Sequence, residues 1–396
     1  MSSAAKKPTI VLYLHMHQPW RVRPYSLFEV GQDHEYYGAD NERVFKKVAD
    51  KSYRPMLTLL GKLLKQHPDF CFSLSVTGTF LEHAEHWGPD IIAKLQDLVK
   101  TGRVEIVAET YYHSLAFFYD ETEFEQQIKL HQAKIKELFG IKSTSFRNTE
   151  LAYNDALAEK VAEMGFKSIV AEGWDKILGW RGPGYVYNAK ANKPLRLLLK
   201  NYRLSDDIAF RFSDKKWSEH PLSAQKYLSW AKSATAEAPL LNLFMDFETF
   251  GEHQWADTGI FEFFEKFVEF WLKDGGDFAT ISEAAEQNAP KDTISMPETV
   301  TWADTERDLS AWVGNAMQRE SLRHLYSLLP EILQRNDKKL LADFRNLTTS
   351  DHVYYMCTKY WNDGDVHAYF SAYESPYDAF LFVTNAIRDL EWRAKA

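Results

Sequence analysis

The sequence predicts an α/β protein in which a mostly parallel sheet closes into a barrel and a helical domain follows. Three observations support this prediction. Between residues 9 and 172, short apolar segments alternate with amphipathic segments of helical period, as consecutive βα units require. At least six strands of this kind are predicted, which favours a barrel over a small open sheet. The last hundred residues have an almost entirely helical pattern, so they are expected to form a small bundle.

The predicted barrel elements follow one another from the N-terminus. Strands are expected at residues 9–14, 70–76, 104–108, 143–148, 168–171 and 240–245, and helices at 54–67, 89–100, 123–139, 154–164 and 260–272. Pro89 and Asn154 suit helix starts, while Gly102 and Gly165 suit positions just past helix ends. Polar residues gather where the strands end, which is where folds of this kind carry their functional groups.

Two segments depart from the regular alternation. Residues 173–239 are rich in Trp, Gly and Pro turns and are interpreted as an insertion into the barrel, with short strands at 195–199 and 208–212 and a helix at 224–233. Residues 278–281 are expected to close the barrel, and Ser282 is expected to cap the helix that follows.

A segment of low hydrophobicity at 287–299 marks the predicted domain boundary. It separates a catalytic barrel, residues 1–290, from a C-terminal helical domain, residues 291–396, which is expected to complete the cleft. The helices of that domain are expected at 304–329, 331–346, 350–359 and 376–393.

The composition excludes several classes of protein. The formal net charge is −9 and Lys and Arg do not cluster, which argues against nucleic acid or an anionic membrane as a partner. No apolar run has the length of a membrane span or of a signal peptide, so a cytoplasmic location is expected. The two cysteines lack the spacing of a disulfide framework or a thiolate metal site. Aromatic residues make up 15% of the chain, and although a large core uses them too, such rings suit sugars as ligands.

Two acids follow the apolar segment 240–245. Because strand side chains alternate between faces, Asp246 and Glu248 are expected to point to one side and Phe247 to the other. Burying two neighbouring carboxylates costs free energy unless they are neutralised, hydrogen-bonded or paired, and catalysis is one reason to accept that cost. The alternative is an exposed strand end whose acids face solvent.

Two histidines follow the first predicted strand. His15 and His17 point to the same side of it and form half of a possible zinc site, which His113, Asp246 and His253 could complete. Two other interpretations stay open. The histidines either form hydrogen bonds within a polar core, or bind substrate and support acid–base chemistry.

Glu150 also follows a predicted strand, and it precedes a capped helix. Its neighbours Arg147 and Asn148 offer hydrogen bonds that would keep the carboxylate ionised and oriented, as a catalytic nucleophile requires. The structural alternative is a glutamate that caps the helix.

Five short motifs occur in the order found in glycoside hydrolase family 57, and the chain resembles that family along its whole length. They are HMHQP at 15–19, GRVE at 102–105, FRNTE at 146–150, DFETFG at 246–251 and WADTERDL at 302–309. Segments TSDHVYYM at 349–356 and DGDVH at 363–367 resemble the α-amylase-like branch. The resemblance implies an irregular seven-stranded (β/α) barrel with a C-terminal helical bundle. It also implies action on α-1,4-glucans with retention of configuration. No metal or cofactor is expected.

The resemblance assigns the two catalytic roles. Glu150 matches the family's catalytic nucleophile and Asp246 its general acid/base. Some α-amylase-like relatives lack one of these acids, whereas this chain keeps both. Arg103 departs from the smaller polar residue that is common at its position in the second motif.

Further residues are expected to bind substrate or support the site. His15, His17 and Glu105 match such positions in the family, and Trp302 matches the aromatic residue of the last motif. The remaining candidates for substrate binding are Gln18, Arg147, Glu248, Asp304 and His352.

Retaining cleavage needs one carboxylate to attack the anomeric carbon and a second acid to protonate the leaving oxygen, with the two groups about 5–5.5 Å apart. Glu150 is expected to be ionised. Asp246 is expected to be protonated, because burial and repulsion from Glu248 raise a carboxyl pKa. Hydrolysis of α-glucans is therefore the leading hypothesis. The alternatives are a 4-α-glucanotransferase or branching-type transglycosylase, a non-catalytic glucan-binding protein, and a zinc-dependent deacetylase or mannosidase.

Overall fold

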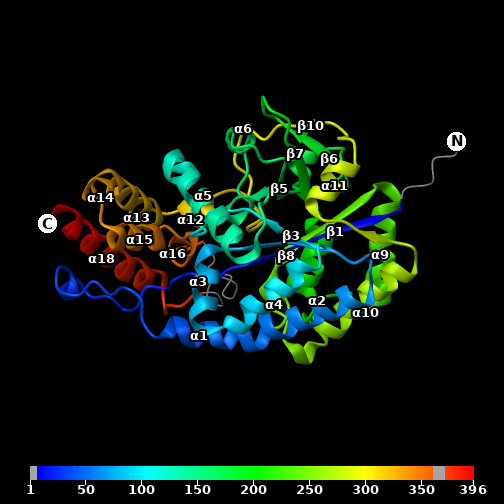
Figure 1. Cartoon of the computed structure of the whole chain (residues 1–396), viewed down its shortest axis with the longest axis horizontal. Helices are drawn as coiled ribbons and strands as arrows, with labels where there is room; N and C mark the ends of the chain where they lie inside the picture. Colours follow the sequence, from blue (N-terminus) through cyan, green and yellow to red (C-terminus); the bar gives the residue numbers. More distant parts are fainter. Residues whose placement is uncertain (1–6, 360–370) are drawn as a thin grey trace.

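The structure is a computed structural model that describes residues 7–359 and 371–396, so the motif at 363–367 lies outside the described residues. Parallel strands form its centre (Figure 1). The first sheet is wholly parallel and has the order β3-β2-β1-β8. It consists of β1 (Thr9–Met16), β2 (Phe72–Val76), β3 (Val104–Val107) and β8 (Leu240–Asp246), and the short β9 (Asp277–Phe278) pairs with the start of β1.

The second sheet has the order β10-β6-β7-β5-β4. Its strands are β4 (Ser145–Arg147), β5 (Ser168–Glu172), β6 (Val186–Ala189), β7 (Arg196–Lys200) and β10 (Thr293–Ile294). Strands β4, β5 and β7 are parallel to one another, whereas β6 runs antiparallel to β7.

Contacts at both edges join the two sheets around one interior. A parallel bridge between Ala108 and Phe146 connects β3 to β4. On the other side, the backbone N–H of Asn201 donates to the carbonyl of Asn242 at 2.9 Å, and the Asn242 amide donates to the Leu199 carbonyl at 2.9 Å. Within the described residues, β1, β2, β3, β4, β5, β7 and β8 thus form an irregular (β/α) barrel of seven parallel strands.

Helices cover the outside of these strands, and their ends follow from the local sequence. The carboxylate of Asp120 and the amide oxygen of Asn154 accept backbone N–H groups at the starts of α5 and α6, and Gly140 ends α5 in the left-handed region, with φ 72°. The helices are α1 (Asp40–Val48), α2 (Arg54–Gln66), α3 (Gly78–Trp87), α4 (Pro89–Lys100), α5 (Glu121–Phe139), α6 (Asp155–Glu163), α7 (Asp175–Leu178), α8 (Tyr202–Asp206), α9 (Ala224–Glu237), α10 (Ile260–Lys273) and α11 (Ile281–Gln287).

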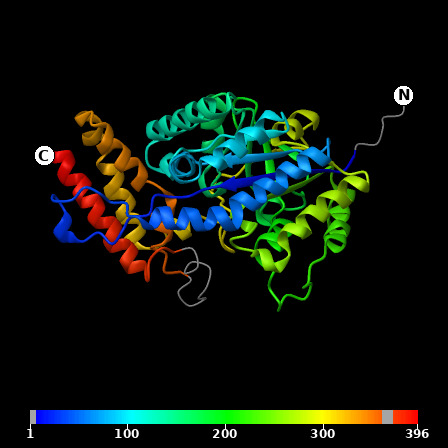
Figure 2. The same cartoon turned by 60° about the horizontal axis from the view of Figure 1, so that its bottom comes forward.

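The C-terminal helices pack together at one end of the molecule, beside a loop from the N-terminal part of the chain (Figures 1 and 2). Asp389 fixes that loop by accepting hydrogen bonds from the Gly31 N–H at 2.7 Å and the Tyr36 hydroxyl at 2.6 Å. Buried Phe344 belongs to the same apolar cluster as Phe146 of β4, so the bundle shares a core with the barrel. Its helices are α12 (Ser310–Val313), α13 (Ala316–Ser327), α14 (Leu329–Arg335), α15 (Lys338–Leu347), α16 (Ser350–Tyr354) and α18 (Pro376–Lys395).

Most predicted elements are confirmed to within a few residues. The strand expected at 208–212 is wrong, because residues 207–211 form a helical turn that continues α8. The strand expected at 195–199 is present as β7. It pairs in parallel with β5 and is therefore a strand of the barrel sheet. The predicted insertion at 173–239 thus contains a strand of the barrel, and for the rest of the segment it stays a prediction.

Smaller corrections concern helix starts. Thr280 caps α11 in place of Ser282, since the Thr280 side chain accepts the backbone N–H of Glu283. The helix expected at 304–329 begins only at Ser310 and is divided into α12 and α13, and the helix expected at 331–346 is divided between α14 and α15. The predicted domain boundary near residue 290 stays a prediction, although residues 293–294 form β10 and pair with β6. None of the helices in the described part of the chain is long and apolar enough to span a lipid bilayer.

Candidate active site

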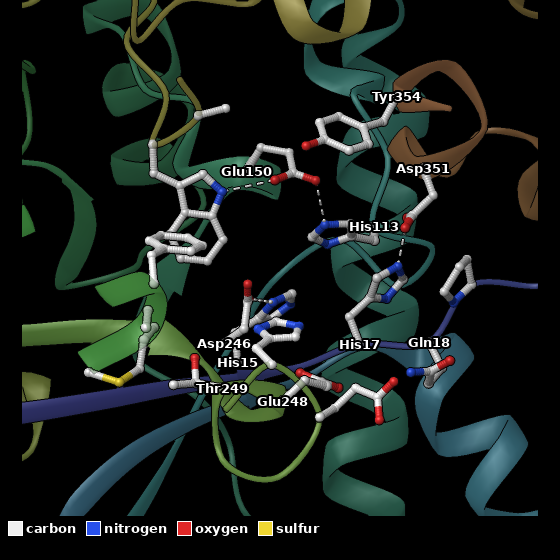
Figure 3. A pocket seen from close by; sticks show the side chains of 18 of the residues that line it. His15, His17, Gln18, His113, Glu150, Asp246, Glu248, Thr249, Asp351 and Tyr354 are labelled. Atoms are coloured by element: carbon white, nitrogen blue, oxygen red, sulfur yellow. Dashed lines mark hydrogen bonds and ion pairs between the residues drawn. The ribbon is translucent and has the colours of Figure 1, made fainter. Parts of the chain in front are cut away.

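A cavity of about 850 Å³ opens at the C-terminal ends of the barrel strands. Its size lies in the range of small-ligand sites, which is about 300–1,000 Å³. His15 and His17 reach it from the end of β1, Asp246 from the last position of β8, and Glu150 from the turn after β4. Asp351 of α16 closes the opposite side (Figure 3). The barrel and the helical bundle thus both contribute to this cavity.

Glu150 is held by three hydrogen-bond donors. Its Oε1 accepts hydrogen bonds from His113 Nε2 and from the Ser350 hydroxyl, each at 3.1 Å, and its Oε2 accepts one from Trp302 Nε1 at 2.9 Å. The backbone of Glu150 is left-handed, with φ 58°, a conformation that non-glycine residues adopt mainly where surrounding structure imposes it. The carboxylate is therefore fixed in one orientation.

The environment of Glu150 favours the charged form. Burial raises the pKa of Glu150, but the hydrogen bond and charge of His113 and the charge of Arg147 outweigh burial and lower it. Burial likewise disfavours the charged form of His113, yet hydrogen bonds to Glu109 and Glu150 raise the pKa of His113 to about 9. An imidazolium thus donates to an ionised carboxylate, which confirms the expected charge of Glu150.

Asp246 and Glu248, the two acids at the end of β8, have pKa shifts opposite to those expected. Burial raises the pKa of Asp246, but the hydrogen bond and charge of His15, with Nδ1 at 3.4 Å from Oδ1, lower it below its ordinary value. Burial and then the negative charge of Asp246 raise the pKa of Glu248 to about 8. The lowered pKa of Asp246 contradicts the prediction that Asp246 is protonated, and the acid whose neutral form is favoured is Glu248. Both acids line the cavity, as predicted.

The raised pKa of Glu248 predicts a pH dependence of stability. The folded protein keeps a proton up to about pH 8 that an ordinary glutamate releases near 4.5, so the free energy of unfolding falls as the pH rises through this window. Glu248→Gln is neutral at every pH and is expected to lack this decline. Thermal unfolding between pH 5 and 9 checks the prediction. The midpoint of the variant minus that of the parent should increase with pH, and a constant difference would contradict it.

A buried cluster around Glu109 contacts the active-site histidines on the side away from the cavity. Oε2 of Glu109 lies 3.2 Å from His15 Nε2 and 3.4 Å from both His113 Nδ1 and Arg147 Nη1. Arg147 is fully buried and does not line the cavity, and its guanidinium lies 5.2 Å from the centre of the Trp302 ring. Arg147 thus lies behind the cavity wall and not, as predicted, at the surface that a substrate would contact.

The helical bundle supplies side chains that the sequence analysis did not single out. Asp351 Oδ2 lies 2.8 Å from His17 Nε2, and Ser350 donates to Glu150. The neighbouring His352, which was predicted to bind substrate, is fully buried and does not line the cavity. Ser350 and Asp351 lie in the segment TSDHVYYM at 349–356, from which only His352 was predicted to bind substrate, because an ordinary helix cap has the same polar TSD pattern.

Three other predicted residues line the cavity, and one does not. Gln18, Trp302 and Asp304 are part of its wall. Glu105 lies near the N-terminal ends of the strands, where its carboxylate accepts hydrogen bonds from Ser73 and Ser282. Glu105 shares a strand face with Glu109, but four residues of extended chain separate them by about 13 Å. The structure therefore contradicts the prediction that Glu105 binds substrate.

The contacts of the described histidines argue against a zinc site. Two groups of potential ligands exist among the described residues: His15, Glu109 and His113, and His17, His113 and Asp351. In the first, the cationic Arg147 Nη1 already lies 3.1 Å from His15 Nε2. In the second, the rings of His17 and His113 stack at 4.1 Å with an interplanar angle of 29°, so their in-plane lone pairs do not converge on one ion.

A (β/α) barrel that brings two carboxylates to one cavity at its C-terminal face defines the class, a glycosidase-type barrel enzyme. The family follows from direct comparison. The model of glycosyl hydrolase family 57 matches residues 11–297, and the chain belongs to this family. The resemblance found in the five motifs is thereby confirmed.

Known relatives agree with this assignment. A protein of Methanocaldococcus jannaschii named "Putative alpha-amylase" is 42% identical over 367 residues, which cover 90% of this chain and 78% of the relative. The α-amylase AmyC of Thermotoga maritima is similar in fold, with a TM-score of 0.66 at 13% identity over 98% of this chain and 97% of that one. The 4-α-glucanotransferase of Thermococcus litoralis gives a TM-score of 0.66 at 16% identity over 88% of this chain, which spans 56% of that enzyme.

Proposed function

We propose that this protein is a retaining glycosidase that cleaves α-1,4-glucans such as starch, glycogen and maltooligosaccharides, with Glu150 as nucleophile and Asp246 as general acid/base. The observation that carries the proposal is the shared cavity, which both carboxylates line in different environments. Glu150 has three donors and a fixed orientation, whereas the Asp246 side chain is 38% exposed and has one histidine contact. The first environment suits attack on carbon, and the second suits proton exchange with substrate and water.

In the first step, a Glu150 oxygen forms a bond to the anomeric carbon while the bond from that carbon to the glycosidic oxygen breaks. Asp246 gives its proton to the leaving oxygen, so a covalent glycosyl-enzyme and a shortened glucan result. In the second step, Asp246 takes a proton from water, whose oxygen bonds to the anomeric carbon and releases Glu150. Each carboxylate returns to its starting state, and the two inversions retain the configuration.

Asp246 must be protonated when the linkage breaks, although the hydrogen bond and charge of His15 lower its pKa and favour the ionised form. A sugar ring that covers Asp246 would displace water from its exposed side and raise its pKa, because desolvation disfavours the charged form. Glu150 is more enclosed, at 17% side-chain exposure, and keeps its three donors, so substrate binding changes its state less. Substrate binding thereby makes Asp246 the proton donor and leaves Glu150 as the ionised nucleophile.

The cavity also contains aromatic surface for sugar rings. Trp302 has two cations near its ring, with Arg147 at 5.2 Å and Lys200 Nζ at 5.3 Å from the ring centre, while its N–H donates to Glu150. An indole fixed in this way offers a rigid apolar face beside the nucleophile.

One observation favours a transglycosylase on the same site. Phe210 lines the cavity and is 57% exposed. A solvent-facing aromatic ring at the rim offers a stacking surface for a second glucan, whose hydroxyl group would replace water in the second step. Hydrolysis and transfer differ only in this acceptor, since both proceed through the same glycosyl-enzyme.

Analysis of the products from maltoheptaose, with and without added glucose as acceptor, tests the proposal. Hydrolysis is expected to give only products shorter than the substrate, and transfer to give longer ones as well. If the substrate were still intact after long incubation at high enzyme concentration, the protein would be a glucan-binding protein without turnover. The same incubation with Glu150→Gln shows whether any observed cleavage belongs to this site.

A further inference from the structure

A second cavity lies next to the active site. It has a volume of about 450 Å³ and is lined by the loops after β5 and β7 and by the end of α9. Tyr202 lines both cavities, so they meet at this side chain. Its ring contacts the guanidinium of Arg307 at 4.2 Å and that of Arg203 at 5.7 Å from the ring centre. The boundary between the two cavities is therefore an ordered aromatic residue.

Trp180 gives this second cavity an exposed aromatic wall. Its side chain is 84% exposed, although tryptophan is among the most apolar residues. Within the described residues, no other ring or cation stacks on the indole, and its N–H has no hydrogen-bond partner. The neighbouring Leu178 is buried and anchors this segment, so the core does not need the Trp180 ring. Trp180 thus presents a free flat face and a free donor beside a cavity.

Polar groups in fixed positions complete the lining. Asp175 Oδ2 accepts hydrogen bonds from the Tyr202 hydroxyl at 2.9 Å and from Arg203 Nη2 at 2.6 Å. The side chains of Asp175 and Arg203 are 54% and 72% exposed, so both keep capacity for further hydrogen bonds. A flat apolar ring beside paired donors and acceptors matches a sugar, whose C–H face stacks while its hydroxyls form hydrogen bonds. A purely apolar ligand would leave these charges desolvated without compensation.

We propose that this cavity is a second α-glucan-binding site, in which Trp180 stacks on a glucose ring and the Asp175–Arg203 pair binds its hydroxyl groups. The inference rests on the proposed function, because the ligand is the same polymer. Its position across Tyr202 from the active site allows one long glucan to occupy both cavities. The second contact then acts at a high effective concentration, so it strengthens the binding of polymers and has little effect on short oligosaccharides.

Binding in the Glu150→Gln background tests the inference without cleavage of the ligand. Retardation in native gels that contain glycogen gives the affinity for the polymer, and calorimetry gives the affinity for maltotriose. Adding Trp180→Ala is expected to lower the affinity for glycogen, relative to that for maltotriose, by about tenfold, as the loss of one stacked aromatic ring predicts. Adding Trp180→Phe is expected to restore most of this loss, because it keeps an aromatic face.

Phe28→Ala is the matched control. Phe28 is 92% exposed but lines neither of the two cavities, so its loss should leave retardation unchanged. If Trp180→Ala and the parent were retarded equally, or if the parent were not retarded at all, the second site would be refuted. Failure of the proposed function would give a different result. The unmodified protein would leave maltoheptaose intact, yet glycogen would still retard it through Trp180. The protein would then bind glucan at this site without acting on it.

Discussion

Glu150→Gln is expected to lower kcat on maltooligosaccharides by about four orders of magnitude while the fold is kept. The amide has nearly the volume of the carboxylate, but it is a poor nucleophile and carries no charge to stabilise the developing positive charge at the anomeric carbon. An amide oxygen at the Oε1 position still accepts from His113 and Ser350, although Trp302 loses its acceptor, so the side chain should keep its place. Initial rates with maltoheptaose, together with the thermal unfolding midpoint, measure both effects.

Glu105→Gln is the control for this prediction. Glu105 is a glutamate of barrel strand β3, and its carboxylate accepts hydrogen bonds from serine groups near the other end of the barrel. Its replacement should change stability and leave kcat of the folded protein within about threefold of the parent. A Glu150→Gln protein with a near-normal rate, or equal losses in both variants, would reject Glu150 as the nucleophile.

Asp246→Asn is expected to have an effect that depends on the leaving group. For maltooligosaccharides, kcat should fall by about three orders of magnitude, since the asparagine cannot protonate the glycosidic oxygen. For 4-nitrophenyl maltosides the first step needs little protonation, so Glu150 should react quickly and the glycosyl-enzyme should accumulate. Stopped-flow absorbance would then show a burst of nitrophenol followed by a slow steady rate. Equal losses on both substrates without a burst would contradict the role of Asp246.

The sequence was sufficient to predict the strand and the turn that bring Asp246 and Glu150 to the cavity. The apolar run 240–245 and its polar end correctly located Asp246 and Glu248 at one cavity, because a buried strand and its alternation are local properties. The turn after β4 likewise brought Glu150 to the same face of the barrel. The alternation of βα units along the sequence is by itself sufficient to predict a parallel barrel.

Long-range contacts explain what the sequence could not show. His15 and Asp246 are 231 positions apart, and their contact lowers the pKa of a carboxyl that burial alone would raise. Ser350 lies 200 positions from Glu150 in the sequence. A helix of five residues is too short for its pattern to show whether Ser350 or His352 faces the cavity. Glu105 is the second residue of β3, so its place near the N-terminal ends of the strands follows from the strand bounds, and the motif match alone suggested a role in substrate binding.

The most direct test of the central claim is the configuration of the products that azide forms with two variants and a 4-nitrophenyl α-maltooligosaccharide. With Glu150→Ala, azide occupies the place of the carboxylate and attacks the anomeric carbon directly, so the β-glycosyl azide is expected. With Asp246→Ala, Glu150 first forms the glycosyl-enzyme and azide then attacks from the opposite face, so the α-glycosyl azide is expected. Proton NMR distinguishes the two anomers. An α product from the Glu150 variant, or a β product from the Asp246 variant, would contradict the assigned roles.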